Sequence, residues 1–226
     1  MSNTHSPEVY DSAELIPVNP KIESYMRHLV AHTDYPVLVE MEEFARLHNF
    51  PIVNRLVGIF LETQARMINA KRVFEFGSGY GYSAYWFAKA VGNGGVVICS
   101  DANAENCTRA EQYLAAAHLW QRIEFCVGTS QEVFMQTEGL FDVCYNDVDK
   151  VGYPDVWRMA KNRIRSGGLY IADNVLWHGR VTMKGIDAES DSTAAIMEHN
   201  QLIFDDPEFD AFINPTRDGV IVAQKK

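Results

Sequence analysis

The sequence predicts a single α/β domain with a seven-stranded, mostly parallel sheet that helices cover on both faces. From residue 72 onward, short β-rich runs alternate with amphipathic helical windows, an order typical of doubly wound sheets. The last two runs, 209–214 and 219–224, follow each other closely. A hairpin there makes the final strand antiparallel to the rest. The length of 226 residues fits one domain of this kind, spanning 1–226.

Seven segments have the β-branched and aromatic composition of buried strands. They are 72–76 (RVFEF), 95–100 (GVVICS), 122–127 (RIEFCV), 141–146 (FDVCYN), 168–173 (GLYIAD), 209–214 (FDAFIN) and 219–224 (GVIVAQ). The strands and the helices between them form the expected core, residues 71–226.

Three amphipathic helices precede this core, in the region 19–70. The first has Asn19 as a plausible cap and Pro20 at its first position. Its apolar side chains, at helical spacing, are Ile22, Tyr25, Met26 and Leu29. The other two lie within 36–50 and 54–70. Residues 1–18 are expected to form a polar, flexible arm.

Composition limits the classes of protein that need to be considered. There are 20 Lys and Arg against 30 Asp and Glu, a net charge of −10, which argues against nonspecific binding of nucleic acid. No stretch approaches the roughly 20 apolar residues of a membrane helix, and the N-terminus lacks the basic and apolar regions of a secretory signal. Four cysteines without a C-x-x-C pair fit free thiols. We therefore expect a cytoplasmic protein.

A glycine-rich loop, FEFGSGYGYS (74–83), follows the first strand and opens a helix. Its third glycine, Gly81, comes one residue too early for the dinucleotide pattern G-x-G-x-x-G, which disfavours NAD. Asp101, at the end of the second strand, is placed to bind ribose hydroxyls. The carboxylate of Glu75 would repel a pyrophosphate and attract a sulfonium cation. The loop favours S-adenosylmethionine, with a plain strand-to-helix turn as the alternative.

Polar side chains also follow the fourth and fifth strands. Asp147, Asp149 and Lys150 follow the fourth, and Asp173 and Asn174 follow the fifth. Ligands of open α/β sheets bind at the carboxyl ends of the strands, so Asp147, Asp173 and Asn174 are expected to converge there. Two carboxylates and an amide oxygen form an incomplete oxygen set that suits Mg²⁺.

Together with these strand ends, the sequence resembles a known family, the cation-dependent class I O-methyltransferases that include the catechol and caffeoyl-coenzyme A enzymes. The segments that carry the resemblance are FEFGSGYGYS, SDAN, VGTSQE, FDVCYNDVDK and ADNVLWHGRV. It runs from about Phe50 to the C-terminus. It implies a Rossmann-like fold, S-adenosylmethionine, a divalent cation (Mg²⁺, or Ca²⁺ or Mn²⁺), a small hydroxylated acceptor and a homodimer. The N-terminal helices look like those of bacterial members, some of which methylate 5-hydroxyuridine in tRNA.

The resemblance also implies roles for individual residues. Asp147, Asp173 and Asn174 would hold the metal, and Lys150 would be the general base. The cofactor would be bound by Val53, Glu75, Gly77, Tyr82, Ser83, Asp101, Ser130, Asp147 and Asp149. Trp177 and His178 would lie on the substrate-facing loop. Three residues depart from the family: Asn146 where an apolar residue is usual, Val148 for alanine, and His178.

These residues predict a mechanism and leave alternatives. A metal ion would lower the pKa of a bound acceptor hydroxyl, and a cation beside Lys150 would favour its neutral, proton-accepting form. We therefore expect methylation of one hydroxyl of a catechol-like or vicinal-hydroxyl compound. The alternatives are methylation of hydroxyuridine in tRNA and, more remotely, an NAD-dependent oxidoreductase.

Four other motifs have ordinary structural interpretations. His28 and His32 are read as surface histidines, and 187–192 (DAESDS) as a solvated loop before a helix capped by Ser190 or Asp191. The basic segment 161–168 is read as a helix end. For Trp177, packing against the N-terminal helices is the alternative to stacking on a substrate.

Overall fold

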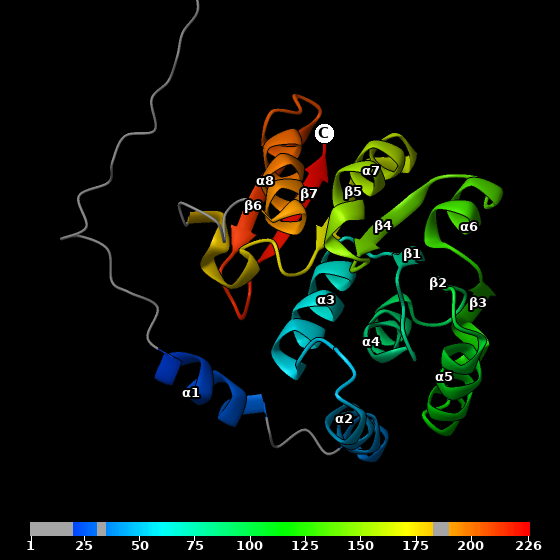
Figure 1. Ribbon diagram of the computed structural model, residues 1–226. Coiled ribbons are helices and arrows are strands. Elements are labelled where there is room, and N and C mark those ends of the chain that lie inside the picture. The colour runs from blue at the N-terminus through cyan, green and yellow to red at the C-terminus, as the bar shows by residue number, and fades with distance from the viewer. Residues whose placement is uncertain (1–19, 31–34, 183–189) are drawn as a thin grey trace, which may run out of the picture.

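The computed structural model describes residues 20–30, 35–182 and 190–226 and contains the predicted α/β sandwich (Figure 1). Seven strands form one sheet in the order β3-β2-β1-β4-β5-β7-β6. Strand β7 is antiparallel to both of its neighbours, β5 and β6, while β1 to β5 pair in parallel. The mostly parallel sheet with an antiparallel final strand is therefore confirmed.

The strands lie close to their predicted positions. They are β1 Arg72–Phe76, β2 Val96–Asp101, β3 Ile123–Val127, β4 Phe141–Asn146, β5 Ile164–Ala172, β6 Phe209–Asn214 and β7 Val220–Lys225. The α-helices are α1 Pro20–Val30, α2 Pro36–His48, α3 Arg55–Met67, α4 Tyr82–Val91, α5 Ala104–Ala116, α6 Ser130–Gln136, α7 Tyr153–Ala160 and α8 Asp191–Phe204. No helix among these is long and apolar enough to cross a membrane, as far as the described residues extend.

Strand β5 corrects one prediction. It begins at Ile164, four residues before the predicted start, so the basic segment 161–168 is a helix end only over the short 3₁₀ turn Lys161–Arg163. Arg165 lies within the strand, where its guanidinium pairs with Asp142 on the neighbouring β4. The ion pair explains how the charged Arg165 is accommodated within the sheet. The composition of this segment alone does not identify it as a strand.

The helix after 187–192 begins as predicted. Ser190 is its N-cap, and the Ser190 hydroxyl accepts a hydrogen bond from the Thr193 backbone amide. The four cysteines are free, and Cys99 and Cys144 are buried. His28 is exposed on α1. The expected arm 1–18, the Asn19 cap, His32 and residues 187–189 lie outside the described residues.

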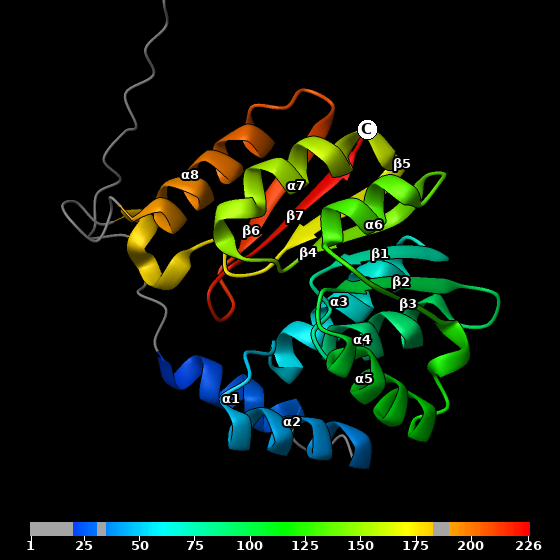
Figure 2. The same ribbon diagram turned by 45° about the vertical axis from the view of Figure 1, so that its right-hand side comes forward.

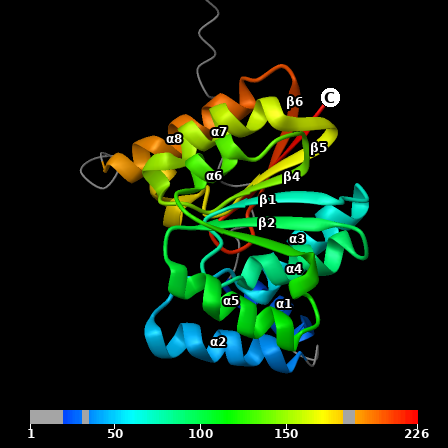
Figure 3. The same cartoon turned by 90° about the vertical axis from the view of Figure 1, so that its right-hand side faces the viewer.

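The sheet separates two hydrophobic clusters. Helices α2 to α5 pack on one face of the sheet, and helices α6 to α8 pack on the other (Figures 2 and 3). Side chains of the central strand β1 alternate between them: Phe74 and Phe76 face the second cluster, where their rings pack against Phe134. Val73 belongs to the first cluster. The two layers hold the carboxyl ends of the central strands in one place.

The N-terminal helices join the first face through a close contact between α3 and α4. A Cβ atom on Gly58 would lie 2.2 Å from Nε1 of the buried Trp86 ring. Only glycine allows this approach without displacing a buried indole. Gly58 thus sets the distance at which the N-terminal helices lie from the sheet.

We expect Gly58→Ala to lower the free energy of unfolding by about 1–3 kcal/mol, because the added methyl group overpacks a filled interface. Chemical denaturation of both proteins measures this loss. Trp86→Phe removes Nε1, the indole atom that the methyl group would approach most closely, so the double variant should regain stability relative to Gly58→Ala with Trp86 intact. A Gly58→Ala protein as stable as the wild type would contradict this account of the interface.

Candidate active site

The predicted site residues follow directly after four adjacent strands. In the sheet register, Phe76 lies beside both Ser100 and Asn146, and Asn146 lies beside Ala172. The residues that come next along each strand are Gly77, Asp101, Asp147 and Asp173. They therefore share one edge of the sheet. The strand order reverses at β1, with β2 on one side and β4 on the other. Ligands of such sheets bind at this switch point.

The glycine loop passes against the end of β4. A Cβ atom on Gly77, whose φ is +79°, would lie 2.8 Å from the carbonyl oxygen of Asp147. The loop is held on its other side by the Ser78 amide, which donates to the Ser100 carbonyl, and by the Gly79 amide, which donates to Asp101 Oδ2 at 3.0 Å. The loop is thus fixed between β2 and β4 and leads into α4.

Asp101 lies rigidly at the end of β2. Its Oδ1 accepts hydrogen bonds from the Asn103 amide at 2.9 Å and from Asn106 Nδ2 at 3.0 Å, in addition to the Gly79 contact at Oδ2. A carboxylate held by three donors keeps lone pairs for further hydroxyl donors. Its position fits the predicted contact with ribose hydroxyls.

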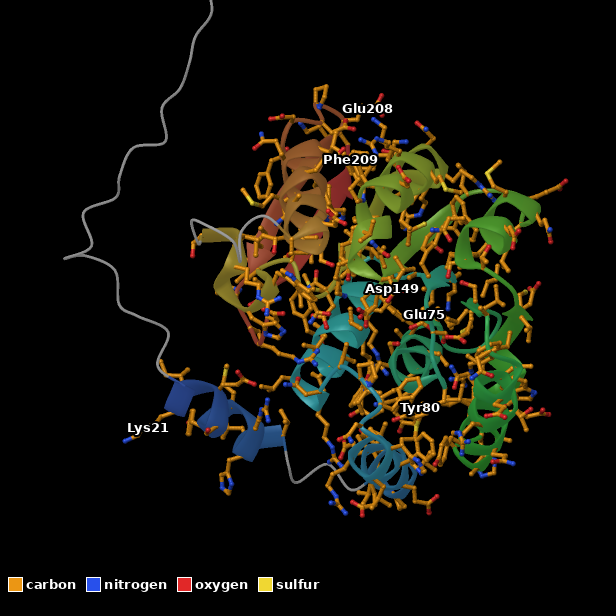
Figure 4. The ribbon with its side chains drawn as sticks, in the orientation of Figure 1. Lys21, Glu75, Tyr80, Asp149, Glu208 and Phe209 are labelled. Atoms are coloured by element: carbon orange, nitrogen blue, oxygen red, sulfur yellow. The ribbon has the colours of Figure 1, made fainter. Side chains whose placement is uncertain are left out.

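Glu75 is a fully buried carboxylate at the end of β1. Its Oε2 accepts from the Ser78 hydroxyl at 2.5 Å and from the Cys99 thiol at 3.5 Å, while Oε1 has no hydrogen-bond partner among the described residues. Burial raises the pKa of Glu75 to about 7, against the opposing effect of hydrogen bonds from Ser78 and Ser83. Figure 4 labels Glu75, in β1, and Asp149, in the segment that follows β4.

Asp147 and Lys150 form a pair after β4. Lys150 Nζ lies 3.0 Å from Asp147 Oδ1 and 2.6 Å from the Tyr153 hydroxyl. That hydroxyl in turn donates to the carbonyl oxygen of Asp173 at 2.9 Å, so Tyr153 connects the ends of β4 and β5. Tyr153 was not predicted from the sequence. Its position three residues after Lys150, at the start of α7, is the one indication that the sequence offers.

Asp173 is a fully buried carboxylate after β5. Its Oδ2 accepts from Arg217 Nη1 at 2.8 Å, while Oδ1 is buried without a hydrogen-bond partner in the described parts of the chain. Burial, followed by the neighbouring Asp147, raises the pKa of Asp173 to about 7. Arg217 also donates to the Ile52 carbonyl at 3.0 Å. Arg217 lies 44 residues from Asp173, and no sequence pattern indicated this contact.

The predicted metal ligands fit a cation in their chemistry. Asp147 and Asp173 influence each other electrostatically, and Asp173 has a buried oxygen without a hydrogen-bond partner in the described structure. Asn174 follows with a left-handed backbone, at φ 59°. Among the described residues, no group of three or more His, Cys, Asp or Glu side chains could hold a metal, so the predicted site depends on the Asn174 amide as its third ligand. The predicted donor set, two carboxylates and one amide oxygen, is of the kind that Mg²⁺ prefers.

A cavity of about 400 Å³ opens beside Asn174, the one predicted metal ligand that lines it. Its wall combines Glu23 and Arg27 of α1, several residues between 174 and 182, and Arg217 and Asp218 of the turn between β6 and β7. Arg27 pairs with Glu23, and Arg217 pairs with Asp173, so both arginines are neutralised locally. The cavity has a wall of mixed polarity, and its lining residues carry no excess of positive charge.

The two residues predicted to face a substrate, Trp177 and His178, both lie after β5 but have different surroundings. His178 is exposed, lines the cavity, and its backbone amide donates to the Asp218 carboxylate. Trp177 packs against the second hydrophobic cluster, with the Arg180 guanidinium 5.7 Å from its ring centroid. Since that cluster is built on α6 to α8, the alternative of packing against the N-terminal helices is not observed.

The remaining predicted cofactor residues lie around the glycine loop. Val53 is buried in the first cluster just before α3, and Ser130 is the nearly buried first residue of α6. Asp149 precedes the 3₁₀ turn Lys150–Gly152. Tyr82 differs, because its hydroxyl donates to Glu42 of α2 at 2.7 Å and so points toward the N-terminal helices.

Comparisons with known proteins agree with this geometry. The profile of the O-methyltransferase family matches residues 29–226. A protein of Dictyostelium discoideum named "Probable caffeoyl-CoA O-methyltransferase 2" is 30% identical over 171 residues, which cover 74% of each chain. The catechol O-methyltransferase of Niastella koreensis is 27% identical over 165 residues, 71% of this chain and 75% of that protein.

A solved structure extends the similarity to three dimensions. The O-methyltransferase from Bacillus cereus, in complex with SAH, superimposes with a TM-score of 0.81 at 26% identity. The superposition covers 91% of this chain and 97% of that one. With a family profile over most of its length and the matching architecture, the chain belongs to the O-methyltransferase family.

Proposed function

We propose that this protein transfers a methyl group from S-adenosylmethionine to one hydroxyl of a catechol-like or vicinal-hydroxyl small molecule, with the help of a divalent cation. The observation that carries the proposal is that Asp147, Asp173 and Asn174 follow neighbouring strands at one edge of the sheet, where Asp147 lies against the glycine loop and Asn174 lines a cavity. The named activities of the Niastella and Dictyostelium relatives support the acceptor class. The SAH complex of the Bacillus enzyme supports the cofactor.

The cofactor would lie at the edge of the sheet formed by the carboxyl ends of β1 and β2. Asp101 would accept from the ribose hydroxyls, and Ser130, on the far side of β2, would contact the adenine. Glu75 would face the positively charged methionine portion, because its carboxylate is buried and has one oxygen without a partner among the described residues. A buried anion of this kind favours a cationic ligand over a phosphate.

The metal would be held by Asp147, Asp173 and Asn174. When bound, a divalent cation of this kind supplies Lewis-acid stabilisation of a hydroxyl's deprotonated form. Arg217 and Tyr153 orient the Asp173 segment, one through the carboxylate and the other through the backbone carbonyl. Ligands that are fixed by neighbouring hydrogen bonds keep their geometry when the substrate enters.

Lys150 would accept the proton of the acceptor hydroxyl. Its amine is held between Asp147 Oδ1 and the Tyr153 hydroxyl, at 3.0 and 2.6 Å, so it cannot drift from the ends of the strands. Burial raises the pKa of Tyr153 well above its ordinary value, so this phenol stays protonated and acts as a fixed hydrogen-bond partner. Positioning of this kind supplies a large part of the acceleration in methyl transfer.

Methylation of hydroxyuridine in tRNA is the second candidate, and it gains no support from charge at the site. The two arginines that line the cavity are paired with Glu23 and Asp173, and the net charge of the chain is −10. An RNA substrate requires unpaired cations along its backbone path. A panel of catechols, phenolic thioesters and hydroxyuridine-containing tRNA separates the two activities. A homodimer and a cytoplasmic location stay predictions.

Asp173→Asn should reduce methylation of a catechol at least 100-fold, because the buried donor set loses its second carboxylate while the side-chain volume is kept. EDTA should cause a comparable loss in the wild type, and added Mg²⁺ should restore it. SAH binding, measured by calorimetry, is the control and should change less than threefold. Full activity in EDTA would disprove the metal-dependent mechanism.

Glu75→Gln should stabilise the ligand-free protein at alkaline pH. The pKa of Glu75 rises from 4.5 unfolded to about 7 folded, so its contribution to stability is complete below about pH 4.5 and is lost as the pH rises through 7. Glutamine cannot ionise and avoids this loss, which amounts to ~3 kcal/mol by pH 8. Thermal unfolding at pH 5 and pH 8 measures the difference.

The matched control is Glu124→Gln on β3, an exposed glutamate that should leave the melting temperature unchanged at both values of pH. The same Glu75→Gln protein should bind S-adenosylmethionine about 10- to 100-fold more weakly, because a charge-assisted contact is removed. Tighter cofactor binding in Glu75→Gln would show that this carboxylate does not face the cation.

A further inference from the structure

A chain of hydrogen bonds runs through the core beneath the site and uses none of the residues assigned above. The Asn146 amide donates to the Tyr170 hydroxyl at 3.0 Å, and that hydroxyl meets His199 Nε2 at 2.9 Å. His199 Nδ1 meets Asn200 Oδ1 at 3.1 Å. The chain thus connects β4, β5 and α8.

Both ends of the chain are bound to backbone atoms. At one end, Asn146 Oδ1 accepts from the Val148 amide at 3.4 Å. At the other end, Asn200 Nδ2 donates to the Val175 carbonyl at 2.8 Å. Val148 directly follows Asp147, and Val175 directly follows Asn174. The chain therefore ends one residue away from a proposed metal ligand on each of the two loops.

The chain has a single direction. The Asn146 NH₂ donates to the Tyr170 oxygen, so the Tyr170 O–H is free to donate to His199 Nε2. The Asn200 NH₂ is committed to a carbonyl, so its Oδ1 accepts from His199 Nδ1–H. Each group then uses the donor or acceptor that its partner requires. Burial lowers the pKa of His199 to about 4, which agrees with a neutral imidazole protonated at Nδ1.

The part of this hydrogen-bond chain from Asn146 to His199 is all-or-none because it is buried, whereas Asn200 is only half-buried. Asn146, Tyr170 and His199 are completely buried, and the Trp157 and Tyr153 rings pack edge-on against Tyr170 and His199, with centroids 4.9 and 5.1 Å apart. In a dry core, a broken link leaves polar atoms without partners on both sides of the break. Packing alone would be served by apolar residues at these positions.

We propose that Asn146, Tyr170, His199 and Asn200 act together as positioning residues that hold the loop after β4 and the loop after β5 at a fixed separation. Their effect on metal binding rests on the proposed function; their effect on the two loops does not. The chain reaches each loop through its backbone, so it sets where Asp147 and Asn174 lie without touching either side chain.

The test breaks the chain at its middle and at its far end. Tyr170→Phe removes one hydroxyl and keeps the ring, and Asn200→Ala removes the contact with Val175. Ile203→Ala, a buried cavity-forming change one turn further along α8, is the control for lost stability. Amide hydrogen exchange is followed in the full-length protein, in peptides covering residues 147–152 and 174–179. Mn²⁺ and SAH binding are measured by calorimetry on the same proteins.

Each single variant should speed exchange at least fivefold in both loops, and the double variant should add less than twofold to either. Ile203→Ala should leave both loops within twofold of the wild type. Effects that stay in the loop next to each substitution and multiply in the double variant would overturn the proposal. So would loop exchange in Ile203→Ala equal to that in Tyr170→Phe.

Metal binding provides the second readout. Tyr170→Phe should weaken Mn²⁺ binding at least tenfold and change SAH binding less than twofold. A wild type that binds no Mn²⁺ would remove the metal from the proposed function, while the exchange pattern would still decide the role of the chain. Suppose the two loops exchange faster in Tyr170→Phe while its Mn²⁺ affinity is unchanged. That result would overturn the claim that the position of the loops determines metal binding.

Discussion

The concentration of carboxylates at one edge of the sheet is the constraint on which the rest of this structure depends. Glu75 lies near the end of β1, Asp147 and Asp173 follow the neighbouring strands β4 and β5, and two of the three carboxylates are completely buried. Buried like charges are costly unless they are paired or neutralised. The protein compensates Asp147 with Lys150 and half of Asp173 with Arg217. Glu75 and Asp173 each keep one buried oxygen without a partner in the described residues, and each has a pKa of about 7. We expect a cationic ligand to gain the most electrostatic stabilisation at these two oxygens.

The compensation divides the site into two halves. The glycine loop, fixed between Asp101 and the Asp147 carbonyl, holds the half around Glu75. Arg217 links the other half to the N-terminal segment, since it binds both Asp173 and the Ile52 carbonyl. Because Ile52 precedes Val53, the segment expected to cover the cofactor is tied to a proposed metal ligand. One arginine on the β6–β7 turn thus joins the proposed metal ligand Asp173 to the segment proposed to cover the cofactor.

Much of this arrangement could be predicted from the sequence, because it follows from local patterns. Alternating strands and helices indicated the fold, and polar residues at strand ends indicated which side chains meet. The residues that were missed, Arg217 and Tyr153, act on Asp173 from 44 and 20 positions away, and only the folded sheet brings them together. The early start of β5 was missed for the same reason, since Arg165 is accommodated by a partner on another strand.

Asn146 illustrates how sheet geometry gives meaning to an unexpected residue. Side chains alternate along β4, so Tyr145 enters the first cluster while Cys144 and Asn146 point to the face of α6 to α8. Cys144 lies beside Tyr170 in the register, which places the Tyr170 ring one step behind Asn146 and lets its hydroxyl reach the amide. An apolar residue at 146 would leave that hydroxyl without its donor and the Val148 amide without its acceptor. The polar residue at position 146 therefore has a structural reason in the partner on β5, and it is the register of the two strands that makes the pair possible.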